Sequence, residues 1–200
     1  MNHYRFSEQV LNGLNLAYTK LFFPQARLIR RPLYLRGKNA FSYGKGFTCG
    51  YACRFDLTNE NKSSLIIGTQ VLMGDYVHIV AQNKVIIGDG CLLASNIFIS
   101  DTNHGTTLKS DPLSSPLIPP NQRPLETKPV IIGKNVWIGE SVSIMPGITI
   151  GDGCIIGAHS VVTKNIPENS MAVGVPAKVI KNYDFDHSLW VNVAHSKGNL

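Results

Sequence analysis

Residues 132–162 read IGKNVWIGESVSIMPGITIGDGCIIGAHSVV. Isoleucine or valine returns at every sixth position of this stretch, at 132, 138, 144, 150, 156 and 162. A helix repeats every 3.6 residues and a strand every two, so neither element alone explains the spacing. The same step occurs earlier, with interruptions, at Leu35, Phe41, Phe47, Cys53, Ile67, Met73, Ile79, Ile87, Leu93 and Ile99.

Six residues are enough for a short strand with an inward aliphatic side chain, followed by a turn of Gly, Asn or Asp. Three such units form a triangular coil, and successive coils stack at the strand spacing of about 4.8 Å. One coil cannot bury its own interior, so several must stack into one column. We therefore predict a mainly β fold, a parallel β-helix. A sandwich would show turn signals every 8–12 residues or so, without fixed phase.

The two ends of the chain are expected to differ from this column. Residues 4–23 carry apolar side chains at near-helical spacing, and Pro24 ends the run, which predicts an N-terminal helix. This helix can cap the open end of the column, or lie on a membrane with Arg27, Arg30 and Arg31 against anionic headgroups. The two roles are compatible. At the other end, one short helix is expected over 185–193.

The repeat stops between Ile99 and Val130. Residues 101–129 contain six prolines and are expected to leave the column as an extruded loop. The predicted organisation is a helical segment over 1–28, a β-helix domain over 29–181 and a short C-terminal tail over 182–200.

The net charge of +6 is unevenly distributed. Residues 1–54 hold nine Lys or Arg and a single acid, Glu8, which suits an anionic partner such as a membrane surface, a nucleic acid or a phosphorylated ligand. Stacking aromatic residues are not interleaved with these cations, so nucleic acid is not expected as a partner.

With neither an 18-residue apolar run nor a signal peptide, we expect a cytoplasmic protein that contacts the inner face of the cytoplasmic membrane.

The four cysteines form no CxxC pair, and reduced core thiols are expected. The spacing of the ligand-type residues predicts no metal site.

His104 lies in DTNHG, where the repeat gives way to the loop. An imidazole with a pKa near neutrality can take the proton of an attacking hydroxyl. The alternative is a solvated loop histidine. Asp101 and Asn103 are the nearest candidates to orient its ring, although a short aspartate in a turn more often caps the local backbone.

The segment from VWIGE (136–140) to GVPAKVIK (174–181), together with DTNHG, RPLE and PVIIG, resembles the hexapeptide-repeat acetyltransferases. The resemblance is strongest to the O-acetyltransferases of bacterial surface polysaccharides such as the lipopolysaccharide O-antigen, which are related to the galactoside and maltose acetyltransferases. It implies a left-handed β-helix, a homotrimer, and acetyl-CoA in the groove between adjacent columns. It also implies that His104 is the general base.

Carried over by position, the resemblance places two residues near the thiol of acetyl-CoA, three along its pantetheine arm and two near its phosphates. In that order they are Trp137 and Glu140; Ala158, Thr163 and Lys164; Lys178 and Lys181. The alternatives are packing under the loop for Trp137 and a solvated face for the lysines.

The chain departs from the sugar acetyltransferases at the acceptor. Their asparagine on an earlier coil, which binds the acceptor or the thioester, corresponds to Gly74 here, flanked by Asp75 and Tyr76. Their acceptor-binding aspartate corresponds to Gln82, beside Asn83. We expect a different acceptor, with Asp75, Tyr76, Gln82 and Asn83 as its candidate ligands.

Together these observations predict direct transfer of acetyl from acetyl-CoA to a hydroxyl of a surface polysaccharide or of its lipid-linked precursor. One alternative is an acetyltransferase for a small diffusible acceptor, such as a free sugar, a nucleotide-linked amino sugar or a xenobiotic. Another is a non-catalytic scaffold, which would have no use for acetyl-CoA.

Overall fold

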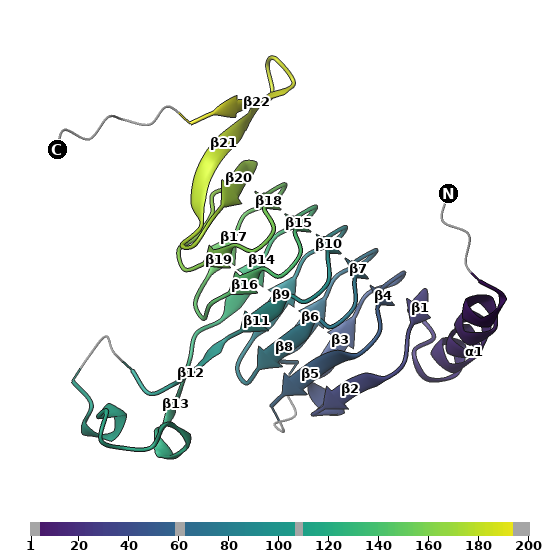
Figure 1. Ribbon diagram of the computed structural model, residues 1–200, viewed down its shortest axis with the longest axis horizontal. Helices are drawn as coiled ribbons and strands as arrows, with labels where there is room; N and C mark the ends of the chain where they lie inside the picture. Colours follow the sequence, from purple (N-terminus) through teal and green to yellow (C-terminus); the bar gives the residue numbers. More distant parts are fainter. Residues whose placement is uncertain (1–4, 59–62, 107–109, 194–200) are drawn as a thin grey trace.

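The computed structural model describes residues 5–58, 63–106 and 110–193. Short parallel strands wind around one column of about seven coils, with a helix at one end and a hairpin at the other (Figure 1). The parallel β-helix predicted from the six-residue step is confirmed.

Three parallel sheets form the sides of the column, and we call them A, B and C. Sheet A contains β1 (Leu28–Ile29), β4 (Thr48–Cys49), β7 (Leu72–Met73), β10 (Leu92–Leu93), β15 (Trp137–Ile138), β18 (Ile155–Ile156) and β20 (Ser170–Val173). Sheet B contains β2 (Leu33–Arg36), β5 (Cys53–Leu57), β8 (His78–Ala81), β11 (Phe98–Ser100), β16 (Ser143–Ile144) and β19 (Val161–Val162). Sheet C contains β3 (Phe41–Tyr43), β6 (Leu65–Ile67), β9 (Val85–Ile87), β14 (Val130–Ile132) and β17 (Thr149–Ile150).

The aliphatic residues of the opening stretch stack inside the column. Ile138 pairs with Ile156 and Ile144 with Val162, and all four are at most 1% exposed. Burial of a side chain of this size stabilises the fold by about 1.5–3 kcal/mol, and the repeat supplies one such side chain per side of each coil.

The predicted phase of the repeat is wrong in the first two coils. Tyr43 pairs with Ile67 and Phe55 with Ile79, whereas Phe41, placed in that phase by the sequence, pairs with Leu65. The cause is the corner between sheets B and C. A 3₁₀ turn, η1 (Lys38–Ala40), adds residues there, so the six-residue step does not continue from β2 into β3.

Close contact between coils explains the glycine that follows several of the inward aliphatic residues, at 133, 139 and 151. A Cβ built on Gly139 would lie 2.6 Å from the backbone nitrogen of Ala158 in the next coil. Glycine allows this close approach.

The corners are joined by a repeated bond that we call the corner ladder. A side-chain oxygen of one coil accepts a hydrogen bond from a backbone N–H at the same corner of the preceding coil, over 2.7–3.0 Å. Besides three such bonds that converge on Asp101, described below, the described residues contain these six pairs: Tyr51–Asp75, Asp75–Ser95, Ser95–Glu140, Thr69–Asp89, Lys134–Asp152 and Thr149–Asn165, donor first.

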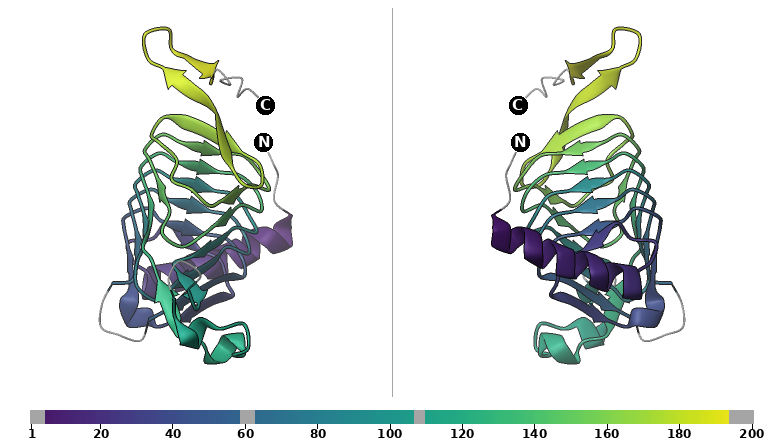
Figure 2. Two further views of the ribbon diagram at one scale, coloured as in Figure 1. Left: turned by 90° about the vertical axis from the view of Figure 1, so that its left-hand side faces the viewer. Right: turned by 90° about the vertical axis from the view of Figure 1, so that its right-hand side faces the viewer.

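Helix α1 (Phe6–Phe22) lies across the N-terminal end of the column (Figure 2, right). The predicted helix is therefore present, shorter by a residue or two at each end. Thr19 is buried at the contact, where its Oγ1 accepts a hydrogen bond from Ile29 N of β1 over 2.8 Å and donates to Asn15 O over 2.6 Å. Phe23, 5% exposed, packs on Tyr43 and closes the interior.

Residues 185–193 do not form the expected helix; this prediction is wrong, because most of them form a turn and a strand. β21 (Lys178–Asp184) and β22 (Leu189–Asn192) form an antiparallel hairpin on β20. Asp184 Oδ1 accepts from the backbone N–H groups of Asp186 and His187 and fixes the turn, and Tyr183 packs on Trp190.

Candidate functional site

His104 is the last residue of β12 (Thr102–His104), which pairs antiparallel with β13 (Leu125–Thr127). This two-stranded ribbon follows sheet B at the corner between sheets B and C, and two 3₁₀ turns, η2 (Pro112–Ser114) and η3 (Pro120–Gln122), lie between its strands. His104 is exposed and sits opposite Leu125, and Asn103 sits opposite Glu126. A hollow of about 210 Å³ lies beside it, lined in part by Gly105, Leu125 and Glu126.

Asp101 is fully buried immediately before this ribbon. Its carboxylate accepts hydrogen bonds from the backbone N–H groups of Gln82, Asn83 and Lys84 over 2.7–3.0 Å, and from Thr102 Oγ1 over 2.6 Å. These bonds tie the start of the ribbon to the corner of the preceding coil. They favour a structural role for Asp101 over the orientation of His104.

Gln82 and Asn83 lie at that preceding corner, below the ribbon. The side-chain Nε2 of Gln82 is 3.5 Å from the carbonyl oxygen of Asp56 on sheet B. Gln82 thereby connects the corner of His104 to a cluster of charged side chains on the outer face of sheet B.

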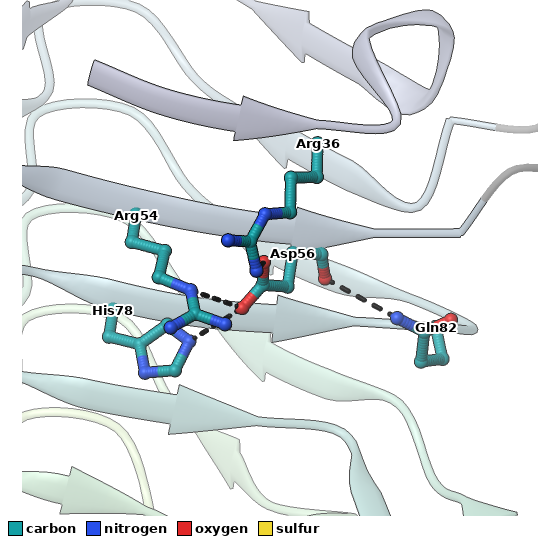
Figure 3. A network of polar contacts seen from close by, with 5 residues as sticks. All are labelled: Arg36, Arg54, Asp56, His78 and Gln82. Atoms are coloured by element: carbon teal, nitrogen blue, oxygen red, sulfur yellow. Dashed lines mark hydrogen bonds and ion pairs between the residues drawn. The ribbon is translucent and has the colours of Figure 1, made fainter.

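Figure 3 shows this cluster, in which the carboxylate of Asp56 lies between three cationic or titratable side chains. Arg36 Nη1 is 3.0 Å from Oδ1, while Arg54 Nε and His78 Nε2 are 2.6 and 3.0 Å from Oδ2. Partial burial raises the pKa of Asp56, but the hydrogen bonds of His78 and Arg54 and the charges of Arg54 and Arg36 outweigh it, so the pKa lies below its usual value. The sequence did not signal this cluster, because its members come from three successive coils and the predicted phase was wrong at Cys53, on the strand that carries Arg54 and Asp56.

Asp75, Tyr76, Glu140 and Ala158 lie at a different corner, between sheets A and B. Asp75 Oδ1 and Glu140 Oε2 are acceptors of the corner ladder, and Glu140 Oε1 accepts a second hydrogen bond from Asn96 Nδ2 over 2.7 Å. Tyr76 is 60% exposed in a left-handed conformation, with φ of 58°. Of these four residues, Tyr76 and Ala158 accept no ladder bond among the described residues.

Trp137 points outward from sheet A, between Leu92 of the coil below and Ile155 of the coil above. Trp137 is 51% exposed and Leu92 46%. Lys178 and Lys181 lie on β21, which follows β20 at the C-terminal end of the same sheet. An exposed apolar strip with two cations at its end fits a long, largely apolar ligand that terminates in phosphates.

The candidate residues therefore fall on three parts of one column: sheet A, the corner between sheets A and B, and the corner between sheets B and C. Sheet A carries Trp137, and the corner of His104 is formed by the other two sheets, opposite sheet A. Figure 1 shows β15 and the β12–β13 ribbon on opposite sides of the column. Thr163 and Lys164, exposed after β19, belong to the corner of His104. Within one chain, His104 and Trp137 cannot face the same substrate.

The four cysteines are buried and free, as predicted. Burial raises the pKa of the Cys91 thiol to about 11. The part of the chain that the structure describes contains no cluster of three or more His, Cys, Asp or Glu side chains arranged to hold a metal ion. In the same residues, no helix combines the length and the apolar character needed to span a bilayer.

Comparison with known proteins supplies the family. Residues 129–164 match the model of the bacterial transferase hexapeptide (six repeats). Over 172 residues, 86% of the chain, it is 44% identical to the putative lipopolysaccharide biosynthesis O-acetyl transferase WbbJ of Escherichia coli K12, and the match spans 87% of that protein. The chain belongs to the hexapeptide-repeat acetyltransferases.

Two further relatives agree with this membership. The galactoside O-acetyltransferase of Escherichia coli K12 is 41% identical over 60% of the chain, and the match covers 54% of that enzyme. A galactoside acetyltransferase structure in complex with coenzyme A superimposes with a TM-score of 0.61 at 35% identity, covering 72% of this chain and 65% of that one. The predicted family is confirmed, and with it the enzyme class and the use of acetyl-CoA.

A point mutant of the N-acyltransferase AntD from Bacillus cereus, in complex with dTDP and coenzyme A, has a TM-score of 0.60 at 20% identity, covering 91% of both chains. This likeness concerns the fold alone.

Proposed function

We propose that this enzyme transfers acetyl from acetyl-CoA to a sugar hydroxyl of a surface polysaccharide, either lipopolysaccharide O-antigen or capsule, or of its lipid-linked precursor. The observation that carries the proposal is the position of His104. Its side chain is exposed at the end of β12, opposite Leu125, and Leu125 and Gly105 line an open hollow. The similarity to WbbJ along most of the chain supports this acceptor class.

We propose a homotrimer of left-handed columns as the active form, with residues 101–129 as its extruded loop. A hollow of about 210 Å³ is smaller than the roughly 300–1,000 Å³ of ordinary ligand pockets. A neighbouring copy that presents sheet A to the corner of His104 would complete the site. Trp137 and Ala158 would then contact acetyl-CoA near its thiol and pantetheine, together with Thr163 and Lys164, while Lys178 and Lys181 would contact its phosphates.

The proposed reaction is a direct transfer. His104 takes the proton of the acceptor hydroxyl as its oxygen attacks the thioester carbonyl carbon. The carbon–sulfur bond then breaks, the acetyl group stays on the acceptor oxygen, and the thiolate of coenzyme A receives the proton. Backbone N–H groups can stabilise the oxyanion, and holding both substrates together supplies much of the acceleration. Asn103, Gln82 and Asn83 are the candidate acceptor ligands on this side, and Asp75 and Tyr76 are those of the neighbouring copy.

Helix α1 supports a location at the inner face of the membrane. Phe6, Val10, Leu14 and Leu21 follow one another along a single side of the helix, and they are 81%, 49%, 57% and 74% exposed. Only the polar Asn15 and Thr19 of this helix are buried against the column. In a trimer with parallel columns, three such helices would face the same direction. We call the side of α1 formed by these four apolar residues its apolar face.

The test is titration calorimetry of acetyl-CoA into wild type and His104→Ala, followed by a thiol-release assay with saccharide acceptors. Both proteins should bind acetyl-CoA equally, and the turnover of His104→Ala should fall by about 10²- to 10⁴-fold. His187→Ala, in the turn after β21, is the matched control and should retain full turnover. Absence of acetyl-CoA binding in wild type would overturn the proposal and favour a scaffold. Equal turnover with free sugars would point to a diffusible acceptor.

A further inference from the structure

An open hollow of about 600 Å³ lies where the end of α1 meets the first two coils. Three cations, Lys20, Arg27 and Lys45, line it together with the amides of Gln25 and Gln70. Lys20 comes from α1, Arg27 precedes β1, and Lys45 lies at the corner after β3. No carboxylate is part of the lining.

The charge of this hollow is not neutralised by the protein. Among the described residues, none of the three cations forms an ion pair. Arg27 Nε donates a hydrogen bond to Thr48 Oγ1 over 3.0 Å, which fixes the guanidinium. The nearest acid along the same corner, Asp89, accepts from Thr69 N and lies 3.9 Å from Lys134 Nζ.

A second hollow of about 370 Å³ adjoins the first and shares Arg27 with it. The surface of its lining is mostly apolar and includes Leu16 of α1 and Leu28 of β1, while Asn12 and Arg30 also line it. Arg27 therefore separates a cationic compartment from an apolar one. A guanidinium binds a phosphate with two parallel hydrogen bonds. Burial of a hydrocarbon chain stabilises its complex in proportion to the apolar area removed from water.

We propose that these two hollows bind one amphiphilic phosphate ester. Its phosphate or diphosphate would lie among Lys20, Arg27 and Lys45, and its hydrocarbon chain between Leu16 and Leu28. The hollows adjoin the helix that carries the apolar face, so the chain of such a ligand would leave the protein near a bilayer. Resting on the proposed function, this identifies the acceptor as a saccharide carried on a lipid phosphate.

Calorimetry on the full-length protein tests the proposal with three probes: farnesyl diphosphate, inorganic pyrophosphate and farnesol. Farnesyl diphosphate should bind at least about tenfold more tightly than pyrophosphate, because it also buries hydrocarbon. Lys20→Gln/Lys45→Gln should weaken its binding by about tenfold or more. Lys38→Gln/Lys134→Gln removes the same charge outside the hollow and should bind like wild type. Leu16→Ser should weaken farnesyl diphosphate but not pyrophosphate.

The proposal would be overturned if the two double-lysine variants bound farnesyl diphosphate with equal affinity. It would also be overturned if wild type bound farnesyl diphosphate and farnesol equally well.

Competition by phosphatidylglycerol vesicles separates the two sources of a lipid phosphate. If they displace farnesyl diphosphate fully, the hollow binds membrane headgroups and the carrier assignment is wrong. Titrating acetyl-CoA into the same proteins keeps the proposals distinguishable. Wild type that binds acetyl-CoA but not farnesyl diphosphate contradicts only this inference, and the reverse contradicts only the acetyl-transfer proposal.

Discussion

At the scale of single residues, the carboxylates near the proposed site have structural partners. Asp101, Asp75 and Glu140 each accept hydrogen bonds from the backbone of the preceding coil. Bonds from backbone N–H groups to a charged acceptor are stronger than those between neutral groups. His104, in contrast, is exposed at the end of a ribbon. The residues that hold the corners and the residue proposed to react with substrate are therefore different ones.

Asp101→Asn should lower the free energy of unfolding by about 1–3 kcal/mol, because its amide cannot accept all four hydrogen bonds and some buried donors lose their partner. Urea unfolding followed by circular dichroism measures this change. Asp186→Asn, on the exposed turn before β22, is the control and should change stability by less than about 0.5 kcal/mol. If Asp101→Asn were as stable as its control and lost turnover, Asp101 would act on His104 instead.

The Asp56 cluster should make stability depend on pH. A carboxyl whose folded-state pKa lies below its unfolded value of 3.8 contributes its full stabilisation above that pH and loses it as the pH falls through the lower folded-state value. Asp56→Asn should therefore be less stable than wild type at pH 7, by about 1 kcal/mol. The difference should shrink below about pH 4. Urea midpoints measured from pH 7 to pH 3 test this, and a constant difference would contradict it.

At the scale of elements, the sequence predicted what depends on local spacing and missed what depends on register. The six-residue step, uninterrupted from Ile132 to Val162, is enough to predict stacked coils. It failed where η1 added residues at a corner, and so Asp56 and His78 were not recognised as neighbours. The C-terminal hairpin was missed because its turn is fixed by Asp184 side-chain bonds and by Tyr183 on Trp190, contacts that a search for helical spacing does not consider.

Two glycines provide a matched test of the close packing between coils. Gly139→Ala should destabilise the protein by more than about 1 kcal/mol, because the new Cβ would meet the backbone of Ala158 at 2.6 Å. At Gly13, in the middle of α1, an added Cβ would have no neighbour within 4 Å. Gly13→Ala should stabilise the protein by about 0.5–1 kcal/mol. Thermal midpoints of both variants measure the contrast, and equal shifts would contradict the proposed contact.

The apolar face of α1 should bind membranes without being needed for folding. Val10→Ser/Leu14→Ser/Leu21→Ser should leave the thermal midpoint nearly unchanged, because these side chains are exposed, and should abolish cosedimentation with phosphatidylglycerol vesicles. Leu117→Ser/Phe185→Ser/Val191→Ser removes exposed apolar side chains elsewhere and should bind vesicles like wild type. Loss of the oligomer in the first variant would instead identify the face as a contact between copies.

At the scale of the whole molecule, the two sides of the column decide where catalysis can occur. Sequence motifs could nominate both His104 and Trp137, because each lies in a recognisable motif. Motifs could not show that the two lie on opposite sides of one column, since that depends on which sheet each coil position enters. The same limit applies to the two hollows beside α1, which form only where the helix meets the first coils.

A complementation experiment tests whether the site lies between copies. His104→Ala and Trp137→Ala should each be weakly active alone. When the two are unfolded together and refolded as a mixture, some interfaces should combine His104 of one copy with Trp137 of another, and activity should reappear. Sedimentation equilibrium should give three times the 21.9 kDa of one chain. A mixture no more active than its components would show that each copy works alone.

The corner ladder has a direction along the chain. In each of its six pairs, the donor belongs to the earlier coil and the acceptor to the later one. At the last coil the order reverses, because Ser160 Oγ of the coil before accepts from Gly174 N. During synthesis from the N-terminus, each new coil would satisfy the amides that the previous one left open, and the Ser160 bond would end the series. The ladder bonds would therefore form in order from the N-terminal coils to the last coil, where the series ends.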